Sequence, residues 1–306
     1  MTGPGEVGSP ALPPVNELVG SSGRLRRRLL FDRAIGWALP LAFVAVLFPL
    51  FDMLYWISAR ALPTFTLATL TENQVGTGGG LYPMILGTLV LIGIGTALST
   101  GIGLVAGFYT SEYAPAPVAR VARIAGNLLA GVPAIVLGYF GYFLLVLYTH
   151  WGFTALAGGI TLGIFMTPYV YRTADVALTN VPPSQREAAL AMGSRRDQYL
   201  VRIAFPIALP TILTGIFFAM ALGLGEAAPI LFTAGFSSTP ITSLMQPTGF
   251  LSGAVWLFYD FPSTYGSFLS LAFQAAFLSV VIVLALNVAV QLFSDRYRER
   301  LRGLYQ

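Results

Sequence analysis

Lysine and cysteine are both missing from this sequence of 306 residues, and histidine occurs only once, as His150. Without lysine, the chain lacks the phosphate-binding residue of a Walker A loop and the nucleophile of a Schiff-base enzyme. Without cysteine it forms no disulfide, and zinc and iron–sulfur sites lose their usual ligands. These absences exclude a Walker-type ATPase and several classes of enzyme. With no cysteine to read, the composition does not indicate whether the protein works in an oxidising or a reducing compartment.

Charged residues are also scarce. They make up 10% of the chain, against roughly 25% in an ordinary soluble domain. Hydrophobic residues make up 56%, and the mean hydropathy is +0.74. This composition predicts a membrane protein.

Six apolar stretches are long enough to cross a hydrocarbon core, which needs roughly 20 helical residues. They predict an all-α, polytopic membrane protein in which residues 34–294 form a six-helix transmembrane domain. The stretch Phe250–Tyr259 is too short to span and predicts an interfacial or re-entrant segment. The predicted spans are Ala34–Ile57, Met84–Phe108, Ile124–Tyr148, Phe153–Tyr171, Ile203–Phe232 and Phe268–Phe293.

Glycine is concentrated in two places. The second span contains Gly87, Gly93, Gly95, Gly101, Gly103 and Gly107, which predict close packing against other helices. Four glycines between Gly76 and Gly80 lack the strand and lysine of a nucleotide loop, so this segment is predicted to be a flexible outer linker.

Arginine placement predicts the orientation, because basic flanks stay on the cytoplasmic side of a membrane. All 17 basic residues are arginines, and only Arg60 falls on the opposite side from the rest. Both termini are therefore predicted to be cytoplasmic, with residues 1–33 as a disordered basic tail and 295–306 as a second basic tail. The first apolar run, about 24 residues long, exceeds the 7–15 residues of a signal peptide and favours an uncleaved span.

The loop between the fourth and fifth spans, residues 182–202, predicts two short helices. Ser184 is placed to cap the first helix, with Glu187 three residues later, and Gly193 is placed to end it in a left-handed turn. Ser194 and Asp197 give a weaker start signal for the second helix. A well-capped cytoplasmic hairpin with no further role would explain this local spacing equally well.

The longer pattern resembles the EAA loop of ABC-importer permeases. Glu187-Ala188-Ala189, three residues, Gly193, nine residues and then Ile-x-Phe-Pro match it, with Phe205 in place of the usual leucine. The resemblance implies the type I, MetI-like permease architecture and a loop that seats on a separate ATPase. The residues that it implies for ATPase coupling are Glu187, Ala188, Ala189, Met192, Gly193, Arg195 and Arg196.

Glu226 is an ionisable residue inside the fifth predicted span, and such residues are functional candidates because they are costly in a membrane. Gly223, Gly225 and Pro229 predict a kink or break in the helix around it. A carboxylate is an unfavourable direct ligand for an anion, so Glu226 is expected to position a cation or couple a gate. The alternative is a structural lock, with Glu226 hydrogen-bonded inside the helix bundle.

The segment Gly223–Ala234 resembles the Gly-Glu-Thr-Ala-Pro-Leu-Leu-Phe-Thr segment of PstA-type phosphate-importer permeases, with Ala227 replacing threonine. Arg172-Thr-Ala-Asp175 resembles the Arg-Thr-Thr-Glu segment of the same family. The resemblance implies a translocation pathway containing Arg172, Asp175, Glu226 and Pro229. Arg172 is then the expected cation, paired with Asp175 one helical turn away; the alternative is that Arg172 is a snorkelling membrane anchor. Leu222 stands where many relatives carry a further arginine.

The family resemblance implies a permease subunit of an ATP-driven phosphate importer in a prokaryotic plasma membrane, surrounded by lipid. The implied partners are a PstC-like permease in a heterodimer, a PstB-like ATPase dimer and a PstS-like phosphate-binding protein. ATP and magnesium would bind the ATPase; no cofactor, metal, nucleic acid or catalytic residue is expected in this chain. Three alternatives stay open: a permease for sulfate or molybdate, an ion-gradient transporter or channel, and an intramembrane enzyme. The last is disfavoured because no paired acidic motif lines a predicted span.

Overall fold

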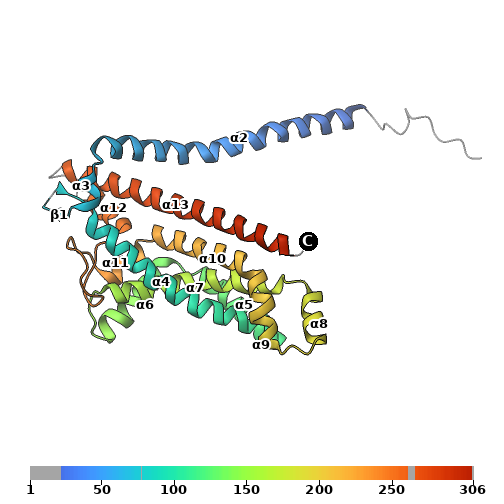
Figure 1. Ribbon diagram of the computed structural model, residues 1–306. Helices are drawn as coiled ribbons and strands as arrows, with labels where there is room; N and C mark the ends of the chain where they lie inside the picture. The colour runs from blue at the N-terminus through green and yellow to red at the C-terminus, as the bar shows by residue number, and fades with distance from the viewer. Residues whose placement is uncertain (1–21, 77, 261–265, 305–306) are drawn as a thin grey trace, which may run out of the picture. The chain divides into compact units, whose positions relative to one another are not determined.

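The computed structural model describes residues 22–76, 78–260 and 266–304 (Figure 1). The chain divides into two units, residues 1–56 and residues 57–306. In the first unit, helix α2 (Ser22–Ala61, continuing into the second unit) begins at Ser22 rather than at Ala34. The part of the predicted disordered tail that comprises residues 1–21 lies outside the described residues.

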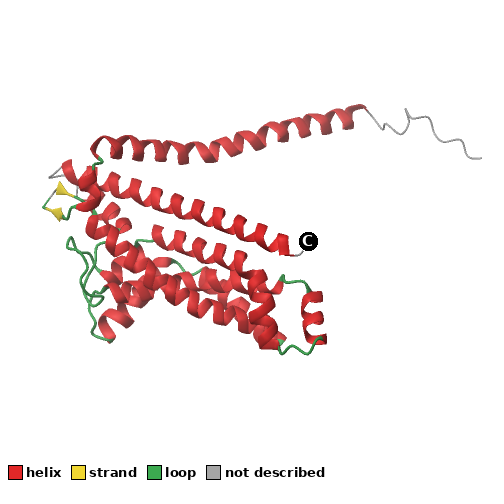
Figure 2. Ribbon diagram, viewed as in Figure 1, coloured by secondary structure: helices red, strands yellow, loops and turns green. Residues whose placement is uncertain are grey.

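The second unit is almost entirely helical (Figure 2). After the end of α2 it contains η1 (Leu62–Thr64), α3 (Leu67–Thr71), β1 (Gln74–Val75) and β2 (Gly78–Gly79). Its first half continues with α4 (Tyr82–Phe108), η2 (Tyr109–Tyr113), α5 (Ala116–Ala130), α6 (Ala134–Gly141) and η3 (Tyr142–Tyr148). Its second half contains α7 (Ala155–Thr179), α8 (Pro183–Ala191), α9 (Arg196–Tyr199), η4 (Leu200–Ala204), α10 (Phe205–Gly225), α11 (Ala228–Ala234), α12 (Leu251–Asp260) and α13 (Gly266–Leu304).

The glycine-rich segment forms a small hairpin, which the prediction of a flexible linker missed. Strands β1 and β2 pair antiparallel, with Gln74 opposite Gly79 and Val75 opposite Gly78. Gly76 and Gly79 adopt positive φ angles of 56° and 86°, which glycine tolerates because it has no Cβ. This hairpin is the one sheet among the described residues of a chain predicted to be all-α.

All six predicted spans correspond to helices. Four helical stretches are long and apolar enough to cross a membrane by themselves: Arg27–Thr64, Tyr82–Tyr113, Arg196–Gly225 and Phe268–Leu292. The predicted fourth span corresponds to α7, a 25-residue helix with many glycine and threonine residues. The short stretch at residues 250–259 forms helix α12, of 10 residues.

The predicted third span, Ile124–Tyr148, is not continuous. Helix α5 ends at Ala130, α6 begins at Ala134, and the two are bent by 93°. Gly131 is the C-cap residue of α5, and Pro133, the residue immediately before α6, has no backbone N–H to donate to the preceding turn, which favours a break between the two helices. The predicted break in the fifth span is confirmed, since α10 ends at Gly225 and α11 begins at Ala228.

Helix α7 lies in the middle of the second unit, where it contacts α4, α5, α6, α10 and α11. Its close packing against α4 depends on glycine: a Cβ on Gly107 would lie 2.6 Å from Cβ of Ala174, and one on Gly103 would lie 2.9 Å from the amide nitrogen of Tyr171. The predicted packing role is confirmed at these positions. At Gly93 and Gly101 no described residue of this chain lies within 4 Å of the Cβ position, so packing there stays a prediction.

The second unit has two distinct ends. Helices α8 and α9 lie at one end of the bundle formed by α4, α7 and α10, whereas α3, α12 and the hairpin lie at the other (Figure 1). Apolar side chains of α7, α8, α9, η4 and α10 form one buried cluster at the first end. We call the end that carries α8 and α9 the coupling end.

Candidate functional site

The first helix of the predicted coupling loop begins differently from the sequence prediction. Pro182 is the N-cap residue of α8, and Pro183 occupies the first helical turn. Ser184 therefore lies inside the helix, and its predicted capping role is wrong. Proline is well suited to the first turn because its fixed φ angle matches a helix and its missing N–H has no helical partner there.

The end of α8 matches the prediction. Gly193 has a φ angle of +82° and donates its N–H to the carbonyl of Leu190 at 3.0 Å. The N–H of Ser194 donates to the carbonyl of Ala189, also at 3.0 Å. These two bonds form a Schellman motif, which stops the helix and turns the chain sharply.

The second helix, α9, starts one residue later than Ser194 was expected to place it. Arg195 is the N-cap residue, and its backbone N–H donates to Oε1 of Gln198 at 3.1 Å. Helix α9 then continues through η4 into α10 without a break. The loop is therefore a short helix, a tight turn and the beginning of a membrane-spanning helix.

The residues predicted to couple to an ATPase separate into buried and exposed positions. Ala189 is 1% exposed and belongs to the buried cluster at the coupling end, so it packs inside the loop. Met192 is 79% exposed. The remaining residues of the set are also exposed: Glu187, Ala188, Gly193, Arg195 and Arg196.

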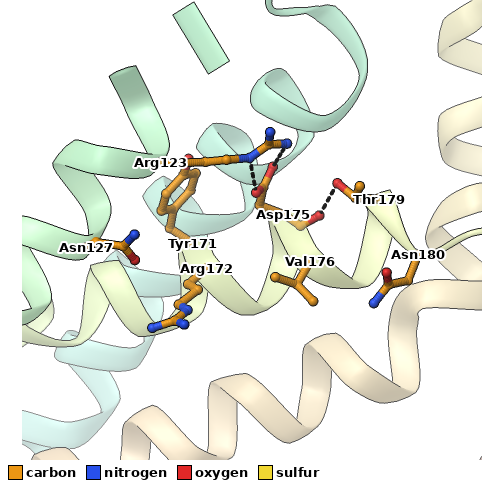
Figure 3. A pocket seen from close by; sticks show the side chains of 8 residues that line it. All are labelled: Arg123, Asn127, Tyr171, Arg172, Asp175, Val176, Thr179 and Asn180. Atoms are coloured by element: carbon orange, nitrogen blue, oxygen red, sulfur yellow. Dashed lines mark hydrogen bonds and ion pairs between the residues drawn. The ribbon is translucent and has the colours of Figure 1, made fainter. Parts of the chain in front are cut away.

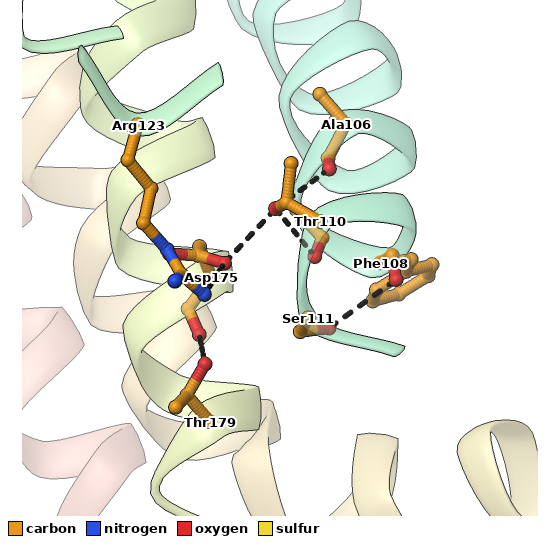
Figure 4. Close-up of polar contacts among 8 residues, drawn as sticks. Ala106, Phe108, Thr110, Ser111, Arg123, Asp175 and Thr179 are labelled. Atoms are coloured by element: carbon orange, nitrogen blue, oxygen red, sulfur yellow. Dashed lines mark hydrogen bonds and ion pairs between the residues drawn. The ribbon is translucent and has the colours of Figure 1, made fainter. Parts of the chain in front are cut away.

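Asp175 does not pair with Arg172, as the sequence suggested, but with Arg123 of α5. Nε and Nη2 of Arg123 donate to the two oxygens of Asp175, at 2.7 Å and 3.1 Å. The hydroxyl of Thr110 in η2 donates to Oδ1 of the same carboxylate at 2.9 Å (Figure 4). An ion pair between residues one turn apart on a helix surface, such as Arg172 and Asp175, contributes about 0.2–0.5 kcal/mol. The bidentate bond between Arg123 and Asp175 is stronger.

Arg172 lies instead on the wall of a pocket between α5 and α7, with a volume of about 290 Å³ (Figure 3). Its side chain is exposed, and no ion pair to it is found within the described part of the chain. Tyr171 is buried, and its hydroxyl has no hydrogen-bond partner among the described residues. The other residues that line this pocket are Arg123, Asn127, Asp175, Val176, Thr179 and Asn180.

Glu226 occupies the break between α10 and α11. Its carbonyl accepts a hydrogen bond from the hydroxyl of Ser252 in α12 at 3.1 Å. Its half-buried carboxylate has no hydrogen bond or ion pair to any described side chain. The structure therefore shows no structural lock through the Glu226 carboxylate. The backbone carbonyl of Glu226 makes the contact with Ser252 instead.

Glu226 and Arg172 are far apart, which corrects the expected pairing between them. Helix α10 packs on α7 so that Gly215 meets Thr173 and Gly223 meets Met166. Glu226 is 11 residues beyond Gly215, which corresponds to roughly 16 Å along a helix with a rise of 1.5 Å per residue. Arg172 is therefore not the cation that Glu226 positions.

Pro229 is buried near the start of α11, next to α6. A Cβ on Gly138 of α6 would lie 2.8 Å from Cα of Pro229, so the two backbones are in close contact. The break in the fifth span is thus held by α6 on one side and by α12 on another. Among the described residues, no group of three or more His, Asp or Glu side chains is arranged as a metal site.

A second ion pair at the coupling end was missed by the sequence analysis. Nη2 of Arg186 in α8 lies 3.3 Å from Oε2 of Glu112 in η2, and the side chain of Glu112 is 7% exposed. The available signal was a carboxylate at the end of a long apolar span. Its partner could not be identified from sequence, because the two residues are distant along the chain.

Comparison with known proteins places this chain in a family. The family model described as "Binding-protein-dependent transport system inner membrane component" matches residues 99–299. The phosphate transport system permease protein PstA 2 of Mycobacterium bovis is 39% identical over 278 residues, which cover 90% of this chain and 91% of that protein. The PstA protein of Haemophilus influenzae is 31% identical and is covered to 92%, with 83% of this chain.

Solved structures share the fold. A chain of the MetNI methionine ABC transporter superposes with a TM-score of 0.59 and 17% identity, covering 71% of this chain and 95% of that chain. A chain of a bacterial alginate ABC transporter superposes with a TM-score of 0.64 and 13% identity, covering 89% of this chain and 98% of that chain. The predicted MetI-like architecture is confirmed.

Proposed function

Because this chain belongs to the family of binding-protein-dependent transport system inner membrane components, we propose that it is the PstA-type permease subunit of a phosphate importer. The observation that carries the proposal is the 39% identity to PstA 2 of Mycobacterium bovis over 90% of the chain. The resemblance of Gly223–Ala234 to the phosphate-importer segment supports the same substrate over sulfate or molybdate.

The proposed complex supplies what this chain lacks. A PstC-like permease completes the pathway, a PstB-like ATPase dimer binds ATP and magnesium, and a PstS-like protein delivers phosphate from outside. The absence of lysine from the chain means that no Walker A loop can form within it, so ATP hydrolysis falls to the ATPase subunit. Exposed Glu187, Ala188 and Met192 of the coupling loop are the surface offered to that subunit.

The proposed pathway uses weak contacts with the anion. Arg172 presents an exposed guanidinium at the pocket near the coupling end, where a phosphate ion leaving the pathway would be briefly favoured. Glu226 marks the break between α10 and α11, at which exposed backbone groups are able to face a solute. Asp175 contributes indirectly, since its charge is matched by Arg123.

Reconstitution tests the function and the partners together. The chain is co-expressed with the three proposed partners, purified, and reconstituted into liposomes with labelled phosphate, sulfate or molybdate. We expect co-purification and ATP-dependent uptake of phosphate, with no uptake when the Walker lysine of the ATPase is replaced. Preferred uptake of sulfate or molybdate would assign another oxyanion. Uptake by this chain alone, driven by an ion gradient, would overturn the proposal.

A further inference from the structure

The inner end of α4 widens into a π-helical turn, η2, which lies against three other helices. The N–H of Ala114 donates to the carbonyl of Tyr109 at 2.8 Å, a bond across five residues. Pro115 follows as the N-cap residue of α5. Such turns are rare and frequently occur at functional sites. Here the turn brings two polar side chains, Thr110 and Glu112, to the coupling end.

Each of these side chains makes one connection to another element. Thr110 donates to Asp175 of α7, whose carboxylate is also bound by Arg123 of α5. Glu112 pairs with Arg186 of α8 at 3.3 Å. The turn therefore connects the spanning helices α4, α5 and α7 with the helix of the coupling loop.

The pair between Glu112 and Arg186 is the connection that reaches the coupling loop directly. The side chain of Glu112 is 7% exposed, and its Oε2 makes no hydrogen bond among the described residues. The charge of Arg186 is thus the main compensation for a carboxylate removed from water, and losing it leaves that charge buried and unpaired. Helix α8 is also joined to the spanning helices by the chain at its ends and by the packing of Ala189.

We propose that the ion pair between Glu112 and Arg186 makes α8 move as one body with α4, so that these two residues are positioning residues for coupling. The inference rests on the proposed function, because the force on α8 comes from a separate ATPase. Movement of α8 then reaches α4 directly and reaches α7 through the contacts of Gly103 and Gly107 and through Asp175.

The chain contains no cysteine, which permits a specific cross-linking test. The double variant Glu112→Cys/Arg186→Cys is assembled with its partners, reconstituted, and measured before and after reaction with a short bis-maleimide. The readout is phosphate taken up per ATP hydrolysed. Before cross-linking we expect a fall of roughly 2- to 30-fold, the range of coupling changes caused by mutations within a network. After cross-linking we expect this ratio to recover.

Two results would overturn the inference. One is a cysteine pair whose ratio equals that of the wild-type complex before cross-linking. The other is a ratio that stays low or falls further when α8 is joined covalently to α4, because the two elements would then need to move separately. A purely structural role would lower assembly and ATP hydrolysis together, leaving the ratio unchanged.

Further variants keep the test decisive. Glu112→Gln keeps the size of the side chain and is used if the cysteine pair does not assemble; it should lower the same ratio. Asp32→Asn makes the same change of carboxylate to amide at an exposed site in α2 and should leave the ratio unchanged. If the wild-type complex itself takes up no phosphate, the proposed function fails, whereas a normal wild type with unaffected variants refutes the ion-pair connection alone.

Discussion

Charged side chains at the coupling end divide into paired and unpaired groups. Asp175 and Glu112 are buried, and each is matched by an arginine from another helix. Arg172 and Glu187 are exposed and have no ion-pair partner within the described part of the chain. The paired residues hold helices together, so the unpaired ones are the residues available to a ligand or a partner subunit.

Glu187→Arg is expected to uncouple transport while the subunit stays in the membrane. A like-charge contact at an interface costs several kcal/mol, and a cost of about 2 kcal/mol already corresponds to a fall in uptake of roughly 30-fold. Labelled phosphate uptake by the reconstituted complex measures this, together with the amount of subunit in the membrane fraction. Asp32→Arg adds the same arginine at an exposed site of α2 and should have no effect. Normal uptake by the Glu187 variant would refute the coupling role.

Arg172→Gln should lower phosphate uptake without destabilising the complex. Loss of a hydrogen bond to a charged group costs about 1.5–3 kcal/mol, which corresponds to roughly 10- to 150-fold. The uptake rate is compared with that of Arg120→Gln, which removes another exposed arginine outside the pocket and should behave as wild type. Unchanged uptake in a correctly assembled Arg172 variant would make this residue a membrane anchor.

At the scale of elements, two membrane segments are interrupted rather than continuous. Pro133 separates α5 from α6 with a bend of 93°, and the segment around Glu226 separates α10 from α11. The unpaired backbone groups at the second break are covered in part by Ser252 of α12. Helices α4 and α7, by contrast, run without a break and pack closely through glycine.

Gly107→Ala tests this packing. The new methyl group would lie 2.6 Å from Cβ of Ala174, so α4 and α7 must separate. Overpacking of this kind costs about 1–3 kcal/mol and should lower the midpoint of thermal unfolding of the purified complex. Gly101→Ala is the matched control in the same helix, because nothing lies within 4 Å of its Cβ position. An equal midpoint for both variants would contradict the packing account.

At the scale of the whole molecule, the second unit has the hairpin and the coupling loop at opposite ends. The hairpin and α12 lie at one end, and α8 and α9 lie at the other (Figure 1). Fifteen of the 17 arginines, as counted without Arg60 and Arg172, lie in the terminal segments or in the two stretches at residues 120–123 and 186–202. This distribution predicts that the coupling end is cytoplasmic.

Single cysteines test the orientation, because the native chain contains none. Ser184→Cys lies in exposed α8, and Val75→Cys lies in the hairpin, where Val75 is 75% exposed. A membrane-impermeant maleimide should label the Val75 variant in intact cells and the Ser184 variant only in inside-out vesicles. The opposite pattern would reverse the proposed topology.

The sequence by itself determined the membrane class, the positions of the long apolar helices, the break near Glu226 and the turn at Gly193. These features follow from apolar length, from proline and glycine, and from motifs that lie within a few residues of one another. Two local predictions failed next to a proline. Ser184 does not cap α8, because the helix already begins at Pro183, and the predicted third span is interrupted just before α6, next to Pro133.

Only the tertiary structure decided which charges meet. Asp175 is bound by Arg123, which is 52 residues away in the sequence, and not by Arg172 one helical turn away. Thr110, which is 65 residues away, donates a further hydrogen bond to the same carboxylate. The antiparallel packing of α10 on α7 likewise separated Glu226 from Arg172. A sequence shows which side chains share a face of one helix, but pairing across helices depends on burial and on bidentate geometry, which exist only after the helices have packed.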